Sequence, residues 1–324
     1  VVVVLGNERG LAKLPSTSVQ YCEPERPCTL VIGPKNHRRW EISFLPGEDP
    51  KGVATAEQTW KLLSRWIGPQ DGQLWRQASY RFHALVARQW RQGRVFLAGD
   101  AAHMQPPFLG QGMCQGIRDV SNLAWKLAAV LNNEVKGAAA QGLLDSYGIE
   151  RQGHVRELTS RIKAVGAVIC ERDPAKARQR DARLLQECGG TVKDTPRQDI
   201  LPALTEGLLS SISSSGRGQL FPQPLLIDEG GVPRRMDLLA ESGWRLVLGP
   251  NFMGEMSVRG IATIALKNGD DPEGVALNWF GRNECCAALV RPDNYVYGVA
   301  RTNADVVQLC REALQELGCG DSLL

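Results

Sequence analysis

The sequence lacks the features that mark several classes of protein. Its 324 residues contain no CxxC pair and only four histidines, so zinc sites and redox disulfides are not indicated and no metal site is expected. Lysine and arginine total 38 and aspartate and glutamate total 35, which indicates neither a nucleic-acid footprint nor a polybasic membrane patch. No apolar run approaches membrane-spanning length, and the odd number of cysteines, nine, favours a reducing cytoplasm over a secreted scaffold.

A dinucleotide-binding G-x-G-x-x-G turn after a strand is also missing. The nearest run, Gly110-Gln111-Gly112 with Gly116, places its third glycine one position too late and follows two prolines. The chain opens on VVVVLG, without the basic region or cleavage site of a signal peptide, and this opening resembles a strand entered in mid-fold.

One stretch, residues 99–131, combines an acid, a stiff loop and a helix: GDAAHMQPPFLGQGMCQGIRDVSNLAWKLAAVL. It follows the short apolar run 94–98, which predicts a strand. Asp100 lies at the end of that strand, where a carboxylate can accept hydrogen bonds from sugar-like hydroxyls. Apolar residues then recur at spacings of four and three, the period of an amphipathic helix: Met113, Ile117, Val120, Ala124, Leu127 and Leu131.

The loop between the acid and the helix suits a flat, negatively charged ligand. Pro106 and Pro107 stiffen the backbone without offering N–H groups, and Gly110 and Gly112 allow the backbone to approach a ring closely. The free N–H groups and the dipole at the start of the helix favour negative charge by roughly 0.3 to 2 kcal/mol. The alternative is that Asp100 only caps a helical turn and the glycines only form a turn. The ordered arrival of so many elements favours a ligand site.

The order GDAAH, PP, GQGM and a helix bearing an acid resembles the second flavin-binding motif of the class A aromatic hydroxylases. These are FAD-dependent monooxygenases built like p-hydroxybenzoate and phenol hydroxylase. The segment PERPCTLVIGPKNHRRWEISFLPGED is similar to the substrate-domain sheet of the 3-(3-hydroxyphenyl)propionate hydroxylase branch. GWRLVLG and RPDNYVYG resemble the thioredoxin-like C-terminal domain of the phenol hydroxylase branch.

The resemblance implies a mixed α/β (α+β) chain: part of a p-hydroxybenzoate-hydroxylase-like flavoprotein fold, followed by a thioredoxin-like domain without CxxC. Residues 1–90 would complete the substrate-binding sheet domain, and residues 91–172 would form the FAD-binding segment with its helices. Residues 173–219, rich in proline, glycine and serine, would be a connector, and residues 220–324 the thioredoxin-like domain. In that family the dinucleotide-binding turn precedes the GD motif, so we expect the C-terminal portion of a longer flavoprotein.

Periodicity and turn residues place the remaining elements. Strands are expected at 28–32, 39–45, 78–87, 245–248, 261–266, 287–290 and 295–297. Helices are expected at 55–67, 142–169, 173–187, 236–240 and 305–317. In the helix 142–169, Tyr147 and Glu150 are interpreted as residues that fix the helix to the flavin domain rather than as catalysts.

The resemblance also assigns roles at the flavin. Asp100 would bind the ribityl chain, Pro107 and residues 110–114 would wrap the isoalloxazine ring, and the N–H groups of Gly112 and Met113 would lie near its charged edge. The full cofactor-binding set is Gly99, Asp100, Pro107, Gly110, Gln111, Gly112, Met113 and Cys114. Related enzymes often have asparagine where Cys114 stands. Arg81 and His83, which share one face of the expected strand 78–87, are candidates for the substrate site, and no residue is assigned a catalytic role.

The function implied by the resemblance is that of a cytoplasmic flavoprotein monooxygenase in aromatic catabolism. NADH or NADPH would reduce FAD, and O2 would serve to hydroxylate a small phenolic acid similar to 3-(3-hydroxyphenyl)propionate ortho to its hydroxyl. The alternative is a truncated, non-catalytic homologue, or one chain of a split flavoprotein whose partner supplies the ADP-binding half. A homodimer also stays open, whereas nucleic-acid and membrane partners are not expected. A flavin halogenase or epoxidase on the same scaffold is less favoured.

Overall fold

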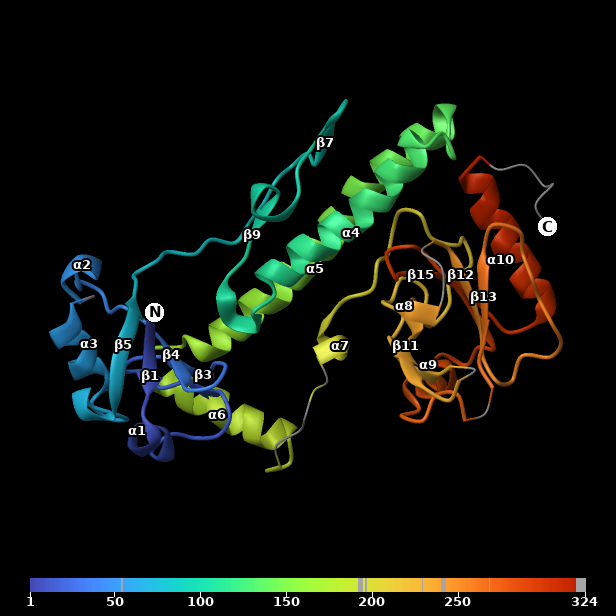
Figure 1. Cartoon of the computed structure of the whole chain (residues 1–324). Helices are drawn as coiled ribbons and strands as arrows, with labels where there is room; N and C mark the ends of the chain where they lie inside the picture. The colour runs from blue at the N-terminus through green and yellow to red at the C-terminus, as the bar shows by residue number, and fades with distance from the viewer. Residues whose placement is uncertain are drawn as a thin grey trace. The chain divides into compact units, whose positions relative to one another are not determined.

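The computed structural model describes residues 1–324 except 54, 192–194, 196, 229, 240–242, 268 and 319–324 (Figure 1). Contacts between Cα atoms divide the chain into two compact units. The first unit contains residues 1–84, 105–109 and 160–195, and the second contains residues 85–104, 110–159 and 196–324. None of the helices that the structure describes is long and apolar enough to cross a bilayer. The two units cut across the four regions expected from the sequence, and that functional division stays a prediction.

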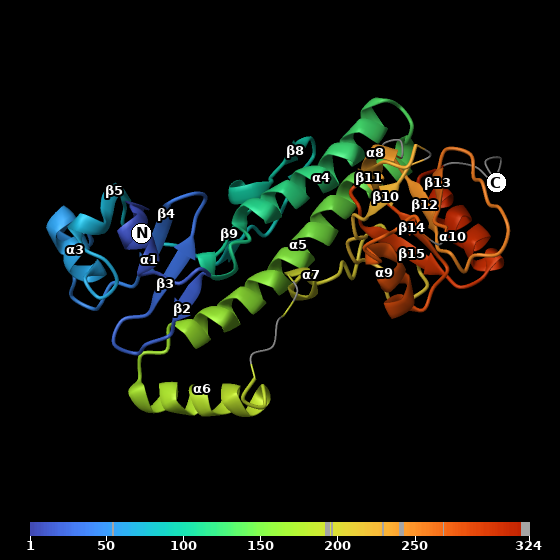
Figure 2. The same cartoon turned by 60° about the horizontal axis from the view of Figure 1, so that its bottom comes forward.

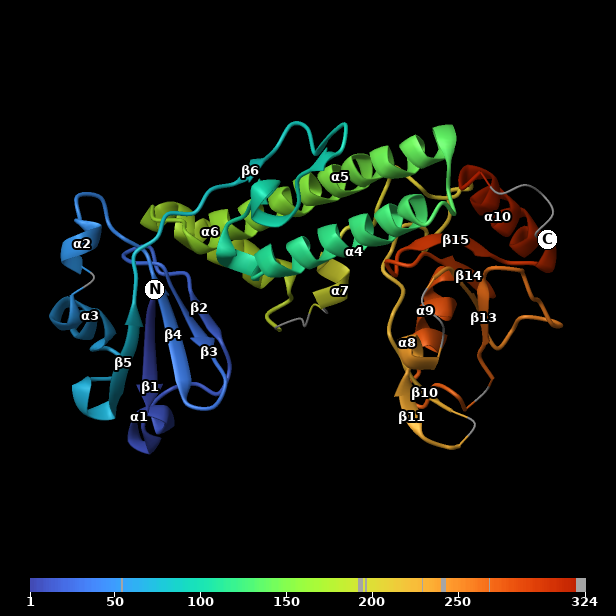
Figure 3. The ribbon, with the colours of Figure 1, turned by 45° about the horizontal axis from the view of Figure 1, so that its top comes forward.

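The first unit is built on a five-stranded antiparallel sheet with the order β2-β3-β4-β1-β5 (Figure 3). Its strands are β1 Val2–Gly6, β2 Val19–Tyr21, β3 Cys28–Ile32, β4 His37–Ile42 and β5 Gly72–Gln77. Its helices are α1 Glu8–Ala12, α2 Pro50–Val53, α3 Ala56–Leu63 and α6 Pro174–Glu187. The expected hairpin of strands at 28–32 and 39–45 is confirmed as β3 and β4, and the helices expected at 55–67 and 173–187 are confirmed as α3 and α6.

The two faces of this sheet differ in burial. Leu30 and Trp40 are paired across β3 and β4 and are fully buried, and they pack in one core with Leu63 of α3. Because side chains alternate along a strand, their neighbours Thr29 and Glu41, which are also paired, lie on the opposite face. One face of the sheet therefore carries the core, and the other is free to carry a site.

The strand expected at 78–87 is wrong for most of its length. The ladder of β5 with β1 ends where Val2 pairs with Gln77. No strand that the structure describes pairs with residues 78–84, and they adopt no regular structure. Only β6 Leu85–Val86 is a strand, and it pairs with β9 His103–Met104 in the second unit.

Two long antiparallel helices, α4 Gly112–Leu131 and α5 Gly137–Ile169, run side by side (Figures 1 and 2). They confirm the helices expected after the GD motif and at 142–169. A small hairpin of β7 Arg91–Gln92 and β8 Val95–Phe96 precedes them. The Tyr147 hydroxyl of α5 donates a 2.6 Å hydrogen bond to the carbonyl of Leu97, which ties α5 to the segment that leads into the GD motif.

Helix α4 has an unusual distribution of residues, because its buried side is polar. Gln115, Asp119, Asn122 and Lys126 are fully buried. The apolar residues at helical spacing are mostly exposed to solvent: Met113 (76%), Ile117 (57%), Val120 (57%) and Leu131 (76%). The spacing correctly predicted the helix, but most of its apolar stripe does not enter the core of the second unit.

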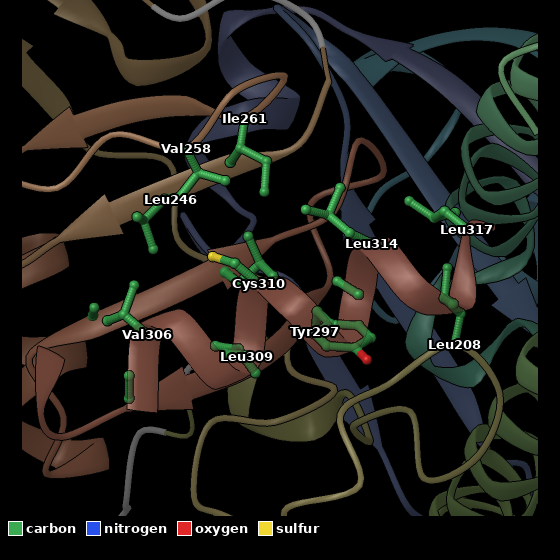
Figure 4. Close-up of a cluster of buried hydrophobic side chains, with 14 of the residues drawn as sticks. Leu208, Leu246, Val258, Ile261, Tyr297, Val306, Leu309, Cys310, Leu314 and Leu317 are labelled. Carbon is green, nitrogen blue, oxygen red and sulfur yellow. The ribbon is translucent and has the colours of Figure 1, made fainter. Parts of the chain in front are cut away.

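The C-terminal part of the second unit contains a four-stranded sheet with the order β13-β12-β14-β15. Its strands are β12 Arg245–Leu248, β13 Ala262–Ala265, β14 Ala287–Val290 and β15 Val296–Ala300; β12 and β13 are parallel and the other pairs are antiparallel. The other elements are α7 Arg197–Ile200, β10 Leu225–Ile227, β11 Pro233–Arg235, α8 Met236–Leu239, α9 Val275–Asn283 and α10 Asn303–Glu316. Leu246 and Leu248 pack in a cluster with α10 (Figure 4), while Val247 packs with α9 on the other face.

These elements confirm the strands and helices expected in this region, with one correction. The unbroken apolar run 261–266 predicts a buried strand, but β13 alternates between half-buried and exposed residues because it is the edge strand of its sheet. The helix expected at 236–240 is α8, and Ala240 lies outside the described residues. The strand order is compatible with the thioredoxin-like domain, which stays a prediction. A disulfide between the adjacent Cys285 and Cys286 would be strained, so the sequence predicts two buried thiols, and in the structure both are half-buried free thiols.

Candidate functional site

The GD motif forms a tight turn held close to α4. Residues Gly99–Ala101 form a 3-10 turn, η2, closed by a 2.9 Å hydrogen bond from the N–H of Ala102 to the carbonyl of Gly99. Gly99 has a φ of +58°, a conformation that favours glycine. A Cβ at Gly99 would lie 3.8 Å from the Cα of Gly116, an ordinary van der Waals distance, so the turn packs directly beside α4.

Asp119 of α4 fixes this turn from its buried side. Its Oδ2 accepts a 2.9 Å hydrogen bond from the N–H of Gly99 and lies 2.8 Å from His103 Nε2, and its Oδ1 accepts a 2.9 Å hydrogen bond from Arg151 Nε. Burial raises the pKa of Asp119, but His103, Arg151 and the Gly99 amide together outweigh that effect and leave the pKa below its usual range. Asp119 therefore serves as a buried anion that orients the motif.

Asp100, the residue after Gly99, takes no part in the hydrogen bonds around Asp119. It is exposed, and its carboxylate makes no hydrogen bond or ion pair with any residue that the structure describes. The N-cap of the η2 turn is Ala98 and has no side-chain capping bond, so Asp100 does not cap the turn. Its two oxygens are free to accept hydrogen bonds from a ligand's hydroxyl groups.

The start of α4 provides an open surface lined by backbone. Gly110 has a φ of +61°, and a Cβ built at Gly110 or at Gly112 would meet no atom within 4 Å. The N-cap, Gln111, is buried and makes no side-chain capping bond, so the first N–H groups of α4 have no partner from the cap. Met113 is exposed and Cys114 is half-buried. The start of α4 therefore presents open backbone with N–H groups that the N-cap side chain does not bind, and the turn that carries Asp100 packs against the same helix.

Pro107 belongs to the first unit, in the 3-10 turn η3, Pro107–Leu109. There it lines a pocket of about 260 Å³ on the sheet face that carries Thr29 and Glu41. The pocket is lined by Val1, Pro27, Cys28, Thr29, Glu41, Ile42, Ser43, Phe44, Tyr80, Phe82, Pro107, Phe108, Ile169 and Cys170. The rings of Phe82 and Phe108 meet edge to face at 5.5 Å between centroids. The pocket is therefore suited to an aromatic ligand.

The residues that the sequence suggested for substrate binding do not line this pocket. Arg81 and His83 are exposed and are not among the residues that line the pocket, and their role in substrate binding stays a prediction. Their neighbours Tyr80 and Phe82 line it instead. The alternation along residues 80–83 separated Tyr80 and Phe82 from Arg81 and His83. Because no strand forms there, the pattern did not show which of the two pairs lines the pocket.

A cluster of buried charges joins α4, α5 and the turn after β14. Glu150 Oε2 accepts hydrogen bonds from Lys126 Nζ (2.8 Å), Arg291 Nη2 (2.7 Å) and Asn122 Nδ2 (2.6 Å). Arg291 Nη2 also donates to Asp293 Oδ2 at 2.7 Å. Burial lowers the pKa of Lys126 to about 8 despite its carboxylate partner. Two cations and two anions compensate one another, which supports a structural role for Glu150.

Comparison with known proteins agrees with this site. Residues 33–162 match the family described as FAD binding domain. The chain is 36% identical over 323 residues to a probable NADH-specific resorcinol 4-hydroxylase of Rhodococcus jostii (strain RHA1), covering 94% of this chain and 58% of that protein. It is 30% identical over 337 residues to a 3-(3-hydroxy-phenyl)propionate/3-hydroxycinnamic acid hydroxylase of Burkholderia cenocepacia (strain HI2424), covering 94% of this chain and 60% of that protein.

Solved structures share the fold. Aklavinone-11 hydroxylase in complex with FAD and aklavinone superposes with a TM-score of 0.64 at 24% identity, covering 97% of this chain and 62% of that one. The OxyS anhydrotetracycline hydroxylase from Streptomyces rimosus superposes with a TM-score of 0.61 at 23% identity, again over 97% and 62%. The chain thus spans about three fifths of the length of these proteins. In its motif, its fold and these relatives, the chain resembles the class A FAD-dependent aromatic hydroxylases.

Proposed function

We propose that this chain binds FAD and forms part of a monooxygenase that hydroxylates a phenolic compound. The observation that carries the proposal is the GD turn and the start of α4: the turn with the exposed carboxylate of Asp100 packs against α4, and α4 begins with an open backbone surface at Gly110 and Gly112. Bound FAD would supply the transfer of electrons from a reduced nicotinamide to O2. The name of the NADH-specific relative supports NADH as the electron donor.

The residues of this chain would bind and orient the cofactor. Asp100 would accept hydrogen bonds from the ribityl hydroxyls, and Asp119 would hold Gly99 so that Asp100 keeps its direction. The N–H groups of Gly112 and Met113 would donate to the negative edge of the ring, supported by the dipole of the 20-residue helix α4. Pro107 would stiffen the loop, and Gln111 and Cys114 would complete the surface.

The phenolic substrate would occupy the pocket that Pro107 lines. Its aromatic walls, Phe82 and Phe108, support the binding of a single ring, and its volume of about 260 Å³ suits a small molecule. The relatives act, by their names, on resorcinol and on 3-(3-hydroxyphenyl)propionate, both of which are phenols with a meta substituent. We propose hydroxylation of such a phenol ortho to its hydroxyl.

The proposal is tested by the visible spectrum and by NADH oxidation. Purified chain, incubated with FAD and freed of excess, is expected to retain a flavin band and to oxidise NADH faster when a phenol is added. Asp100→Ala is expected to weaken FAD retention about tenfold or more, since hydrogen bonds to a charged acceptor contribute about 1.5–3 kcal/mol. Asp145→Ala, a change at an exposed carboxylate of the same unit, is the matched control. Protein that never takes up FAD, either alone or together with the ADP-binding half of a related hydroxylase, would refute the proposal.

We also infer that the apolar stripe of α4 packs against further protein that completes the FAD site. Ile117 and Val120 are more than half exposed, although large apolar residues on a helix that begins at the proposed flavin site are costly to leave in water. A segment that carries the ADP-binding half, in a longer form of this protein or in a separate chain, would provide this surface, and a homodimer is the competing arrangement.

Charge introduced on the stripe tests this inference. Val120→Glu is expected to abolish FAD retention, whereas Ser121→Glu, at the adjacent exposed position, is expected to preserve it. Light scattering after gel filtration distinguishes a homodimer from a complex with a second chain. Equal FAD retention in the two variants would exclude a role for this surface.

A cytoplasmic location is also proposed. It is supported by the cysteines, because all eight that the structure describes are free thiols, as a reducing compartment requires.

A further inference from the structure

The pocket of the first unit contains a single charged side chain. Glu41 lies on β4, opposite Thr29 of β3, on the sheet face away from the core that contains Trp40. Its side chain is 22% exposed. Every other side chain that lines the pocket is apolar or uncharged, including Tyr80 and Ser43.

The cationic side chains near the pocket do not line it. Arg39, two residues before Glu41 on the same face, has its Nη2 3.2 Å from Glu41 Oε1 and a side chain that is 47% exposed. Arg81 and His83 are exposed and also lie outside the lining. The lining does include the N-terminal ammonium of Val1, which donates a 2.7 Å hydrogen bond to the carbonyl of Ala78 and whose pKa is lowered by burial. A ligand inside the pocket therefore meets the carboxylate of Glu41 and no cationic side chain, and the lining cation is this ammonium, which already bonds Ala78.

An uncharged phenol and a phenolic carboxylate interact differently with these charges. A hydroxyl of an uncharged phenol can donate a hydrogen bond to Glu41, and hydrogen bonds to a charged acceptor are stronger than those between neutral groups. The carboxylate of a phenolic acid cannot donate, and it brings a second negative charge close to Glu41 in a partly desolvated site. Like charges at a few ångströms repel, and Arg39 reduces the repulsion only in part because it is half exposed.

We propose that Glu41 is a specificity-determining residue that makes the pocket select uncharged polyhydric phenols over phenolic carboxylates. The aromatic ring would lie against Phe82 and Phe108, and one hydroxyl would donate to Glu41. This inference rests on the proposed function, which assigns the pocket to the substrate, and it chooses between the two substrate classes that remained open there.

Titration calorimetry on the full chain tests the inference without any flavin chemistry. The probes are resorcinol and 3-(3-hydroxyphenyl)propionate, and resorcinol is expected to bind about tenfold more tightly or better. Glu41→Gln is expected to weaken resorcinol binding and to strengthen binding of the acid, so that the preference disappears. Glu41→Asp is expected to keep the sign of the preference. Glu57→Gln removes the same charge from an exposed position in the same unit and is expected to change neither affinity.

Several results would overturn the proposal. These are tighter binding of the acid by the unaltered chain, an unchanged preference in Glu41→Gln with native circular dichroism, or no binding of either phenol. FAD uptake and phenol-dependent NADH oxidation, measured separately, distinguish this failure from failure of the proposed function. A chain that takes up FAD and prefers the acid would retain the function and lose this inference. A chain with Glu41-dependent resorcinol binding but no FAD uptake would retain this inference and lose the proposed function.

Discussion

The Oδ2 atom of Asp119 accepts a hydrogen bond from the backbone N–H of Gly99 at 2.9 Å. This contact joins the GD turn to the middle of α4. The same carboxylate accepts a hydrogen bond from Arg151 of α5, so one buried side chain connects the proposed cofactor turn with both long helices. Asp100 follows Gly99 directly, and the direction of its free carboxylate depends on this support.

Replacing Asp119 with asparagine is expected to destabilise the second unit and weaken FAD binding. Arg151 would lose its buried anion, and breaking a buried ion pair from one side costs about 3–5 kcal/mol. Asp145→Asn is the matched control, since its ion pair with Arg91 leaves Asp145 62% exposed and exposed pairs contribute about 0–1 kcal/mol. Urea unfolding compares the two variants. Equal free energies of unfolding would contradict the role assigned to Asp119.

The open surface at Gly112 makes a second prediction. Gly112→Leu is expected to leave the free energy of unfolding unchanged or slightly higher, because the added side chain meets no atom within 4 Å and leucine favours helix. It is expected to abolish FAD retention by occupying the space of the ring. Gly142→Leu, at an equally open and exposed position in α5, should retain FAD. Retention of FAD by Gly112→Leu would show that the cofactor does not approach this surface.

Much of the local structure at the site could be predicted from the sequence. Spacing identified α4, and the glycines and prolines before it identified a loop with a special backbone, because these signals are local. The acid on α4 was noticed but given no partner, since its contacts with Gly99 and Arg151 join positions far apart in the sequence. The apolar stripe of α4 also gave no indication that the buried side would be polar.

The lining of the pocket in the first unit also could not be predicted from the sequence. Glu41, Phe82, Phe108 and Ile169 come from four separate segments, and only the folded chain brings them together. Alternation suggested that residues 78–87 form a strand, but a strand also needs a neighbour, and no strand that the structure describes pairs with residues 78–84. Periodicity describes a segment's preference, whereas pairing and burial depend on other segments.

In the buried cluster around Glu150, we expect the two cations Arg291 and Lys126 to contribute unequally to stability. Arg291→Met is expected to destabilise the protein by about 3–5 kcal/mol, because Glu150 and Asp293 would share the single remaining cation, Lys126. Lys126→Met should cost less, about 1–2 kcal/mol, since Arg291 still compensates both carboxylates and the burial penalty of the lysine is removed. Urea unfolding of both variants measures the difference. A larger loss in Lys126→Met would contradict this ranking.

Glu316, in the last turn of α10, predicts a pH dependence of stability. Burial and the nearby charge of Glu312 raise the pKa of Glu316 to about 7 in the folded chain, above the usual value of 4.5 for a glutamate. The contribution of the protonated form is therefore fully present below about pH 4.5 and is lost as the pH rises through 7. Glu316→Gln keeps an uncharged side chain at every pH. It is expected to raise the free energy of unfolding at pH 8 by about 1 kcal/mol, a value reduced from the full shift because the side chain is partly exposed.

Thermal or urea unfolding of the two proteins at pH 5 and pH 8 measures this effect. At pH 5 the difference should be small, because Glu316 is protonated in the folded chain and the variant resembles it. The exposed Glu284→Gln is the control and should not change the pH profile, since its side chain is 82% exposed. A gain from Glu316→Gln that is equal at both pH values would mean that the substitution acts through packing or helix propensity, and that the charge of Glu316 does not limit stability above pH 7.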